Sequence, residues 1–158
     1  MNGMTRGSDM NREAAFCKII SGRMPWLVEW VSRGLGEPNT DWAGTNYYTV
    51  AFYYYEKLVG GLVYHDLRPG CDVWWTIFTT DKKWCNRKTL SFVFHLAFDV
   101  FKCRRVSVGV SRNNLASLSL VKRLGFKFEG YLRGYRDNGE DVILFGMLEN
   151  ECLWKEKK

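Results

Sequence analysis

Residues 113–130 carry a capped helix that stops at a glycine and runs directly into a strand. Apolar side chains recur at every third position from Leu115 to Leu124, which predicts a buried stripe along a helix. Asn114 can cap the helix N-terminus, and Gly125 stands where a left-handed residue commonly ends a helix. This stretch therefore predicts a core-packed helix that is followed at once by a strand.

The order of predicted elements indicates an α+β fold. Two tight connections, Glu56-Lys57 and Asn138-Gly139, predict hairpins, and Gly60-Gly61 predicts a bulge or a close backbone approach inside a strand. Such mixed order predicts a sandwich with helices on both faces of one sheet. The predicted helices are 12–21, 26–33, 89–101 and 114–124, and the predicted strands are 47–55, 58–65, 73–79, 105–111, 126–135 and 141–148.

Length and charge set the scale of the protein. A chain of 158 residues fits one domain, 1–158, in which we expect residues 1–10 to be mobile. The net charge of +6 suits either nucleic acid or a small polyphosphate ligand. Aromatic residues reach 16%, which we interpret mainly as core side chains and alternatively as a surface for a ligand or partner.

The cysteines and the apolar runs bear on the class of protein. Five cysteines are scattered without a Cys-x-x-Cys pair, which argues against a disulfide framework and predicts no metal site. Residues 1–12 are polar and have no signal-peptide core, and no apolar run approaches a membrane-spanning length. These features predict a soluble, cytoplasmic protein with reduced thiols and no membrane partner.

Asn-x-x-Ser at 114–117, Leu-Gly-Phe at 124–126 and Glu-Gly at 129–130 form a specific string. The string closely resembles the GNAT superfamily of acyl-CoA-dependent N-acetyltransferases, in particular the branch with ribosomal-protein N-terminal acetyltransferases. The strings at 103–106 and 146–152 look like those of uncharacterised GNAT-like proteins of phages and bacteria. The resemblance implies the GNAT fold, with a mixed, mostly antiparallel sheet, an acyl-CoA-binding half at 73–148 and an acceptor side at 11–72.

The resemblance implies acetyl-CoA as co-substrate. Strand residues would pair with the pantetheine arm, and the N-terminus of the following helix would hold the pyrophosphate. At that helix the chain departs from the family, because residues 80–89 contain no glycine in the expected phosphate loop and offer basic side chains instead. The predicted acyl-CoA-binding residues are Ile77, Phe78, Thr79, Lys83, Asn86, Arg87, Lys88, Thr89, Asn114 and Ser117.

Three residues are predicted for proton transfer. The superfamily often places an acidic Tyr four residues beyond the Ser117 position, where this chain has Val121, so Ser117 is the predicted acid. His65 is a candidate base because imidazole titrates near neutral pH, although the main interpretation is a histidine on the surface. Glu129 is a second candidate with an equally plausible structural role, and water is a third.

The predicted function is direct transfer of an acetyl group from acetyl-CoA to a primary amine, which could be a protein N-terminus, a lysine or a small amine. The alternative is a GNAT-fold protein, of the kind that phages encode, that binds or modifies nucleic acid. The net charge and the glycine-free loop support that alternative. The sequence leaves the acceptor open, and it leaves open whether the protein is a monomer or a homodimer.

Overall fold

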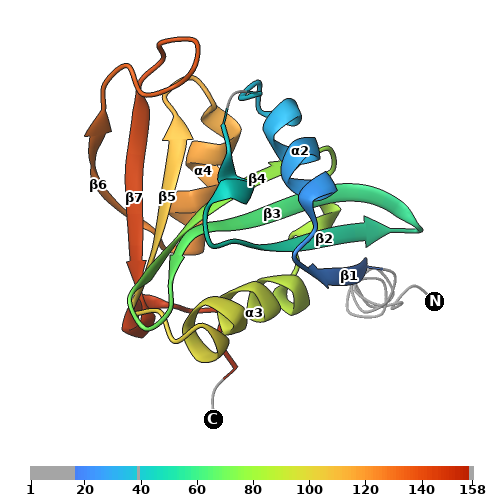
Figure 1. The fold of residues 1–158 in the computed structure, drawn as a ribbon. Helices are drawn as coiled ribbons and strands as arrows, with labels where there is room; N and C mark the ends of the chain where they lie inside the picture. Colours follow the sequence, from blue (N-terminus) through green and yellow to red (C-terminus); the bar gives the residue numbers. More distant parts are fainter. Residues whose placement is uncertain (1–16, 39, 157–158) are drawn as a thin grey trace, which may run out of the picture.

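The computed structural model describes residues 17–38 and 40–156, which build a seven-stranded sheet in the order β1-β2-β3-β4-β5-β7-β6 (Figure 1). Neighbouring strands are antiparallel except for β4 and β5, which are parallel. The strands are β1 Cys17–Gly22, β2 Tyr48–Tyr54, β3 Lys57–Arg68, β4 Asp72–Thr79, β5 Arg105–Ser111, β6 Lys127–Leu132 and β7 Val142–Leu148.

Helices cover both faces of this sheet, as the sequence predicted (Figure 1). On one face, α2 (Pro25–Gly34) packs its apolar stripe on β2 and β3. On the other face, α3 (Arg87–His95) and α4 (Leu115–Leu124) cover the larger core. A π-helical turn, Leu96–Val100, extends α3 over the rest of the helix predicted for 89–101. The α+β class is confirmed.

The helix predicted for residues 12–21 is wrong where the structure describes it. Residues 17–22 form β1, which pairs antiparallel with β2 along its whole length. The apolar pattern of this short segment fits either period, and the open edge of β2 supplies backbone hydrogen bonds that favour the strand. Residues 1–16, including the segment expected to be mobile, lie outside the described residues.

The Gly60-Gly61 pair has both predicted features. The β2–β3 register shifts between Phe52 and Tyr53, opposite Gly60, so β3 carries a bulge there. A methyl group on Gly61 would lie 2.8 Å from a Leu27 side-chain carbon and 2.9 Å from one of Val31. Glycine at 61 therefore lets α2 pack directly against the sheet.

The α4 stripe is buried at only one end. Val121 and Leu124 are buried, but Leu115 is 75% exposed. In an α-helix, each step of three residues falls about 60° short of a full turn. Three such steps separate Leu115 from Leu124, so the two side chains lie about 180° apart around the helix axis. The predicted stripe is therefore wrong at Leu115, although the ends of the helix are as predicted. Asn114 Oδ1 accepts from the Ser117 amide at 3.1 Å, and Gly125 has a φ of +101°.

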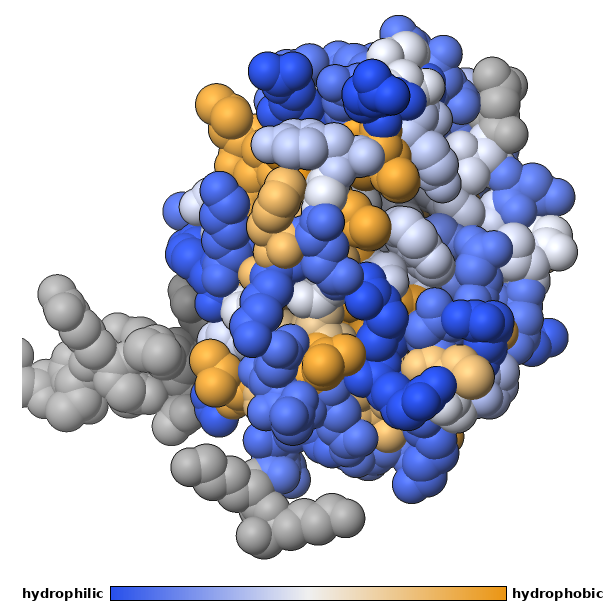
Figure 2. Space-filling view, turned by 90° about the vertical axis from the view of Figure 1, so that its left-hand side faces the viewer, coloured by the Kyte–Doolittle hydropathy of each residue, from blue (hydrophilic) through white to orange (hydrophobic). Residues whose placement is uncertain are grey.

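Most of the large aromatic side chains belong to the core, as the main interpretation held. Tyr64, Phe52, Trp75 and Trp84 are buried. Exposed aromatic rings occur mainly on or near the edge strand β6, and Figure 2 shows that on this side of the molecule hydrophobic residues lie in separate patches among hydrophilic ones. The exposed aromatic residues are Trp26, Tyr55, Phe128, Tyr131 and Tyr135.

Helix length and the state of the cysteines complete the description of the fold. In residues 17–38 and 40–156 no helix is long and apolar enough to cross a membrane. All five cysteines lie in the described part of the chain, and each is a free thiol. The fold therefore rests on packing and hydrogen bonds, with no disulfide contribution.

Gly61→Ala is expected to lower the free energy of unfolding by about 1–3 kcal/mol, because the added methyl group forces α2 away from the sheet. Gly130→Ala is the matched control, since nothing lies within 4 Å of its added Cβ. Urea unfolding curves of the two variants measure the difference. Equal stability of both variants would contradict the close packing of α2 at Gly61.

Candidate active site

A cleft opens where the parallel strands β4 and β5 stop pairing. Their ladder runs from Asp72 to Trp75 on β4, and the remaining residues, 76–79, have diverged from β5. The cleft has a volume of about 250 Å³ and is lined by residues from both faces of the sheet. It therefore connects the side covered by α3 and α4 with the side covered by α2.

The half of the cleft beneath α3 and α4 is apolar. It is lined by Ile77, Leu90, Val93 and other core side chains. Trp75 also lines it and is only 6% exposed, and its indole Nε1–H has no hydrogen-bond partner among the described residues. An unpaired buried N–H costs free energy, which an oxygen of a bound molecule would remove.

The N-terminus of α4 faces the same cleft. Asn114 and Ser117 both line it and are half-buried. The Asn114 side-chain oxygen caps the helix, so its amide NH₂ group is the part that could bind a ligand. The predicted ligand role and the structural role of Asn114 are therefore compatible.

The predicted phosphate loop is organised by its own hydrogen bonds. Asn86 and Thr89 form a capping box at the start of α3, and the buried Thr89 hydroxyl also donates to the Trp84 carbonyl. Trp84 fills the space beneath the loop, with its ring 5.1 Å from that of Phe52. The side chains of Asn86 and Thr89 are thus committed to the protein, whereas Arg87 and others remain on the surface.

The surface side chains of this loop are Lys83, Arg87 and Lys88, all exposed. The Lys83 ammonium lies 4.7 Å from the Tyr54 ring centre, and the Arg87 guanidinium lies 5.6 Å from that of Trp154. These cations sit at the start of α3, where a helix N-terminus favours anions.

The two other predicted strand residues face away from the apolar half or lie beside it. Phe78 packs on the α2 face, where its ring centre lies 5.0 Å from that of Trp30. The Phe78 ring also occupies the space that a side chain at Gly34 would need. Thr79 lies beside Gly60. Only their backbone groups could serve a ligand in the cleft.

His65 lies inside the cleft, so the surface interpretation is wrong. It is 6% exposed, and its ring stacks between Trp42 at 5.2 Å and Trp74 at 6.4 Å. Nδ1 lies 2.6 Å from Asp66 Oδ2, and Nε2 lies 2.8 Å from Thr76 Oγ1. Burial lowers the pKa of His65, and the Asp66 carboxylate opposes that effect only in part. The ring is therefore neutral near neutral pH.

Glu129 lies apart from this group. Its two carboxylate oxygens accept from Arg105 at 2.8 and 2.9 Å, on the exposed face of β5, β6 and β7. It does not belong to the cleft lining, and its carboxylate is occupied by the ion pair. The fold thus brings His65, Ile77, Asn114 and Ser117 together but leaves Glu129 outside.

Sequence reasoning missed an ion pair that closes the α2 side of the cleft. Glu37 is buried, its partner Arg136 is half-buried and 99 residues away in the sequence, and Arg136 Nη2 also donates to the Leu35 carbonyl at 2.8 Å. The pair joins the loop after α2 to the loop between β6 and β7. No local pattern pairs two such loops, so only the folded chain reveals it.

Two further lining residues carried a signal that could have been used. Trp74 and Thr76 alternate with Val73, Trp75 and Ile77 along the predicted strand. Since alternate residues of a strand face opposite sides, Trp74 and Thr76 had to face the side of the sheet opposite to Val73, Trp75 and Ile77, which is the side that α2 covers. Tyr135 completes this aromatic lining from the β6–β7 loop.

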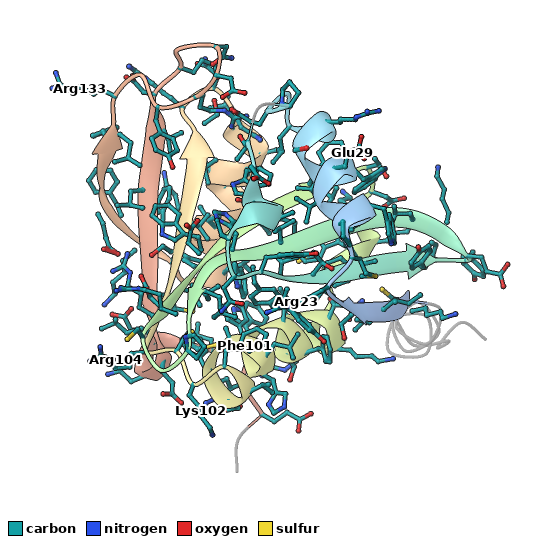
Figure 3. The ribbon with its side chains drawn as sticks, viewed as in Figure 1. Arg23, Glu29, Phe101, Lys102, Arg104 and Arg133 are labelled. Atoms are coloured by element: carbon teal, nitrogen blue, oxygen red, sulfur yellow. The ribbon has the colours of Figure 1, made fainter. Side chains whose placement is uncertain are left out.

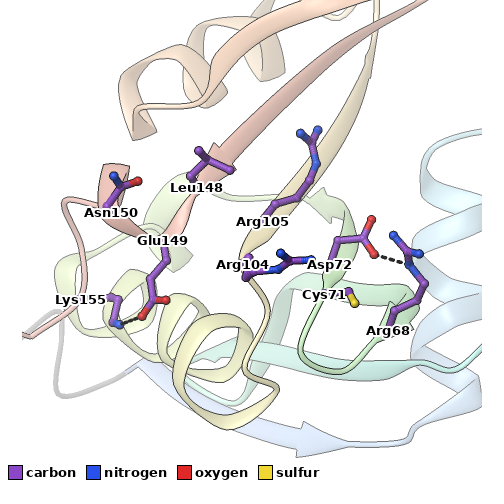
Figure 4. Close-up of a pocket in the computed structure, with 9 residues that line it drawn as sticks. All are labelled: Arg68, Cys71, Asp72, Arg104, Arg105, Leu148, Glu149, Asn150 and Lys155. Carbon is purple, nitrogen blue, oxygen red and sulfur yellow. Dashed lines mark hydrogen bonds and ion pairs between the residues drawn. The ribbon is translucent and has the colours of Figure 1, made fainter.

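A second hollow lies at the other end of β4 and β5 (Figure 4). It is wide and open, with a volume of about 840 Å³. Its charges are largely neutralised within the protein, since Arg68 pairs with Asp72 and Lys155 with Glu149. The paired charges make it a weaker candidate for a ligand site than the cleft.

Comparison with known proteins gives a consistent result. A probable spermine N(1)-acetyltransferase of Bacillus subtilis subsp. natto is 32% identical over 111 residues, which is 63% of this chain and 70% of that protein. The spermine/spermidine N(1)-acetyltransferase of Bacillus subtilis is 31% identical over the same coverage. No protein-family model matches the chain.

Solved structures share the fold. A mutant form of the spermidine N-acetyltransferase SpeG from Vibrio cholerae matches with a TM-score of 0.67 and 13% identity, over 88% of this chain and 97% of that one. A ribosomal-protein alanine acetyltransferase from Vibrio fischeri matches with a TM-score of 0.58 and 20% identity, over 70% of this chain and 64% of that one.

Arg136→Met is expected to destabilise the protein by about 3 kcal/mol, because it leaves the Glu37 carboxylate buried without its partner. The double variant Glu37→Leu/Arg136→Met should recover most of that loss. Lys127→Ala, which breaks the ion pair between the exposed Lys127 and Glu151, is the control and should cost less than about 1 kcal/mol. Thermal unfolding measures all three, and equal losses in the single variants would contradict a structural role for the Glu37–Arg136 pair.

Proposed function

The chain belongs to the GNAT family of N-acetyltransferases, and on this premise we propose that it transfers the acetyl group of acetyl-CoA to a primary amine of a polyamine. The observation that carries the proposal is the cleft between β4 and β5, which reaches both faces of the sheet. Such a cleft lets a thioester and an amine approach each other from opposite sides. Direct transfer in one complex then needs mainly correct orientation.

The apolar half of the cleft suits the acyl donor. The diverged residues 76–79 have backbone groups that β5 does not use, and these would pair with the pantetheine arm and stabilise the developing oxyanion. The unpaired Trp75 N–H and the Asn114 amide would add two donors. Lys83, Arg87 and Lys88 would attract the phosphates in place of a glycine-rich loop.

The α2 half of the cleft suits a cationic amine. Trp42, Trp74 and Tyr135 line it, and the faces of such rings attract ammonium groups. Asp137 adds a carboxylate to the same lining, whereas the carboxylate of Glu37 is paired with Arg136. The names of the two curated relatives, a probable spermine N(1)-acetyltransferase and a spermine/spermidine N(1)-acetyltransferase, support this choice of acceptor over a protein N-terminus or a lysine.

The proposed chemistry uses His65 as base and Ser117 as acid. His65 is neutral because burial lowers its pKa, so Nε2 can take up a proton from the amine side. Ser117, on the first turn of α4, would protonate the departing thiolate. Proton transfer of this kind typically contributes about 10²–10⁴-fold to a rate. Glu129 is the weaker candidate, since Arg105 occupies its carboxylate.

The charge distribution favours acetyl transfer over nucleic-acid binding. Arg68, Arg105, Lys127, Arg136 and Lys155 each pair with a carboxylate of the same chain. In Figure 3, Arg133 lies at the top of the view and Lys102 and Arg104 lie near the bottom, with Arg23 between them, so these other basic side chains do not form one cluster. Nucleic-acid binding relies on cations that are clustered and available to phosphates.

Incubation of the protein with acetyl-CoA and spermidine or spermine is expected to yield the monoacetylated polyamine and free CoA, detected by mass spectrometry and a thiol assay. Lysine and a peptide with a free N-terminus test the other acceptors. Failure with every amine, together with DNA binding that weakens steeply with salt, would favour the nucleic-acid alternative.

Asn114→Asp is expected to weaken acetyl-CoA binding about 5–20-fold in calorimetric titration, the loss of about one hydrogen bond. Aspartate keeps the helix cap but lacks the NH₂ donor, so α4 should stay intact. Arg87→Ala should also weaken binding, whereas Arg133→Ala, at another corner of the molecule, should not. Equal affinities in all three variants would contradict the proposed donor site.

A further inference from the structure

We infer that Thr76 is the residue that contacts the acceptor amine and passes its proton to His65, which Asp66 orients. This inference rests on the proposed function, since it assigns the proton path of the same reaction. Asp66, His65 and Thr76 form a continuous hydrogen-bonded chain whose Thr76 end lines the cleft. The chain has the geometry of a carboxylate, an imidazole and a hydroxyl acting in series.

Thr76 lies on β4 at the point where this strand separates from β5. Trp75 is the last β4 residue in the ladder with β5, so Thr76 is the first residue of the diverged part. Its side chain faces the acceptor side, as its hydrogen bond to His65 requires. A hydroxyl at this point lies between the imidazole and the space where the strands separate.

The tautomer of His65 follows from its two partners. The Asp66 carboxylate can only accept, so the ring proton lies on Nδ1. Nε2 therefore accepts from the Thr76 hydroxyl, whose oxygen keeps lone pairs for a further donor in the cleft. An ammonium group is such a donor.

A strained backbone fixes Asp66 in this arrangement. The β3–β4 register breaks between His65 and Arg68, and Asp66 has a φ of +48°, which is uncommon outside glycine. The Asp66 amide donates to Thr45 Oγ1 at 3.0 Å, and Leu67 and Asn46 exchange two further hydrogen bonds. The bulge thus turns the Asp66 carboxylate onto Nδ1, and such strain is concentrated at functional sites.

The protons and electrons balance along this path. The substrate ammonium gives one proton to Thr76 Oγ1 while the Thr76 hydroxyl proton moves to His65 Nε2. The resulting neutral amine forms the C–N bond, and the C–S bond breaks with its electron pair on sulfur. A second amine proton reaches that sulfur through Ser117, and the third stays on the amide. His65 returns its proton to solvent past Asp66, whose side chain is 55% exposed.

Thr76→Val is expected to lower kcat about 100-fold or more, within the range of lost proton-transfer catalysis, with unchanged acetyl-CoA affinity. Thr76→Ser keeps the hydroxyl and should retain most activity. Thr49→Val is the matched control, because Thr49 is a buried strand threonine on β2 whose hydroxyl donates to the Gly22 carbonyl. Its kcat should equal that of the wild type.

The pH profile separates proton transfer from a merely structural role. Wild-type kcat should fall as pH drops below the usual histidine range, because burial lowers the pKa of His65 and protonation then blocks Nε2. This fall of kcat at low pH should be absent from the profile of Thr76→Val. The charged groups facing this part of the cleft are Asp66 on the same strand, Glu37 after α2, and Arg136 and Asp137 between β6 and β7.

A measurement without substrate tests the hydrogen bonds themselves. The chain has two histidines, so His95→Gln leaves His65 as the single imidazole in a ¹⁵N NMR titration. Neutral His65 should carry its proton on Nδ1, and Thr76→Val should shift the Nε2 resonance. A proton on Nε2 would overturn the relay.

Three further outcomes discriminate between explanations. Full activity and an unchanged pH profile in Thr76→Val would overturn the relay while leaving the proposed function intact. A wild-type protein that acetylates no amine would overturn both. An acetyl group mapped to Thr76 by peptide mass spectrometry, after incubation with acetyl-CoA alone, would identify Thr76 as a nucleophile and would also overturn the relay.

Discussion

The site depends on the end of one ladder, where the parallel strands β4 and β5 separate after Trp75. A sheet paired along its full length would separate the space under α2 from the space under α3 and α4. The divergence joins the two spaces through a gap bordered by backbone. It also releases the backbone groups of residues 76–79 from β5, so that one structural feature supplies both access and hydrogen-bonding capacity.

The polar groups in the cleft are held by segments that are distant in the sequence. Thr45 and Asn46 hydrogen-bond to Asp66 and Leu67 and so hold the irregular part of β3 between His65 and Arg68. Trp42, in the same segment, stacks on His65. The Glu37–Arg136 pair connects the loop after α2 to the β6–β7 loop and closes the α2 side of the cleft. Burial of such groups is costly unless each has a partner, and here the partners come from opposite halves of the chain.

The two halves of the cleft differ in what they leave unsatisfied. The apolar half contains a buried indole N–H that has no partner among the described residues, whereas in the α2 half His65 is bonded at both nitrogens. An unpaired donor in an apolar cavity suits a ligand oxygen, and a complete hydrogen-bonded chain suits proton transfer. The loop before α3 has no glycine with which to wrap its backbone around a phosphate. The Asn86–Thr89 capping box and the buried Trp84 stabilise this loop.

The sequence by itself determined the order of the main helices and strands from residue 26 onward, the α+β class, the helix cap at Asn114 and the close approach at Gly61, because each is encoded in local spacing or in a special residue. The resemblance of residues 114–130 likewise indicated the family. The sequence could not determine β1, because a short apolar segment fits either period until an open strand edge is available. It also could not show that His65 is buried, that Glu129 pairs with Arg105, or that Glu37 meets Arg136. These are contacts between segments far apart in the chain, so only the tertiary structure decided them.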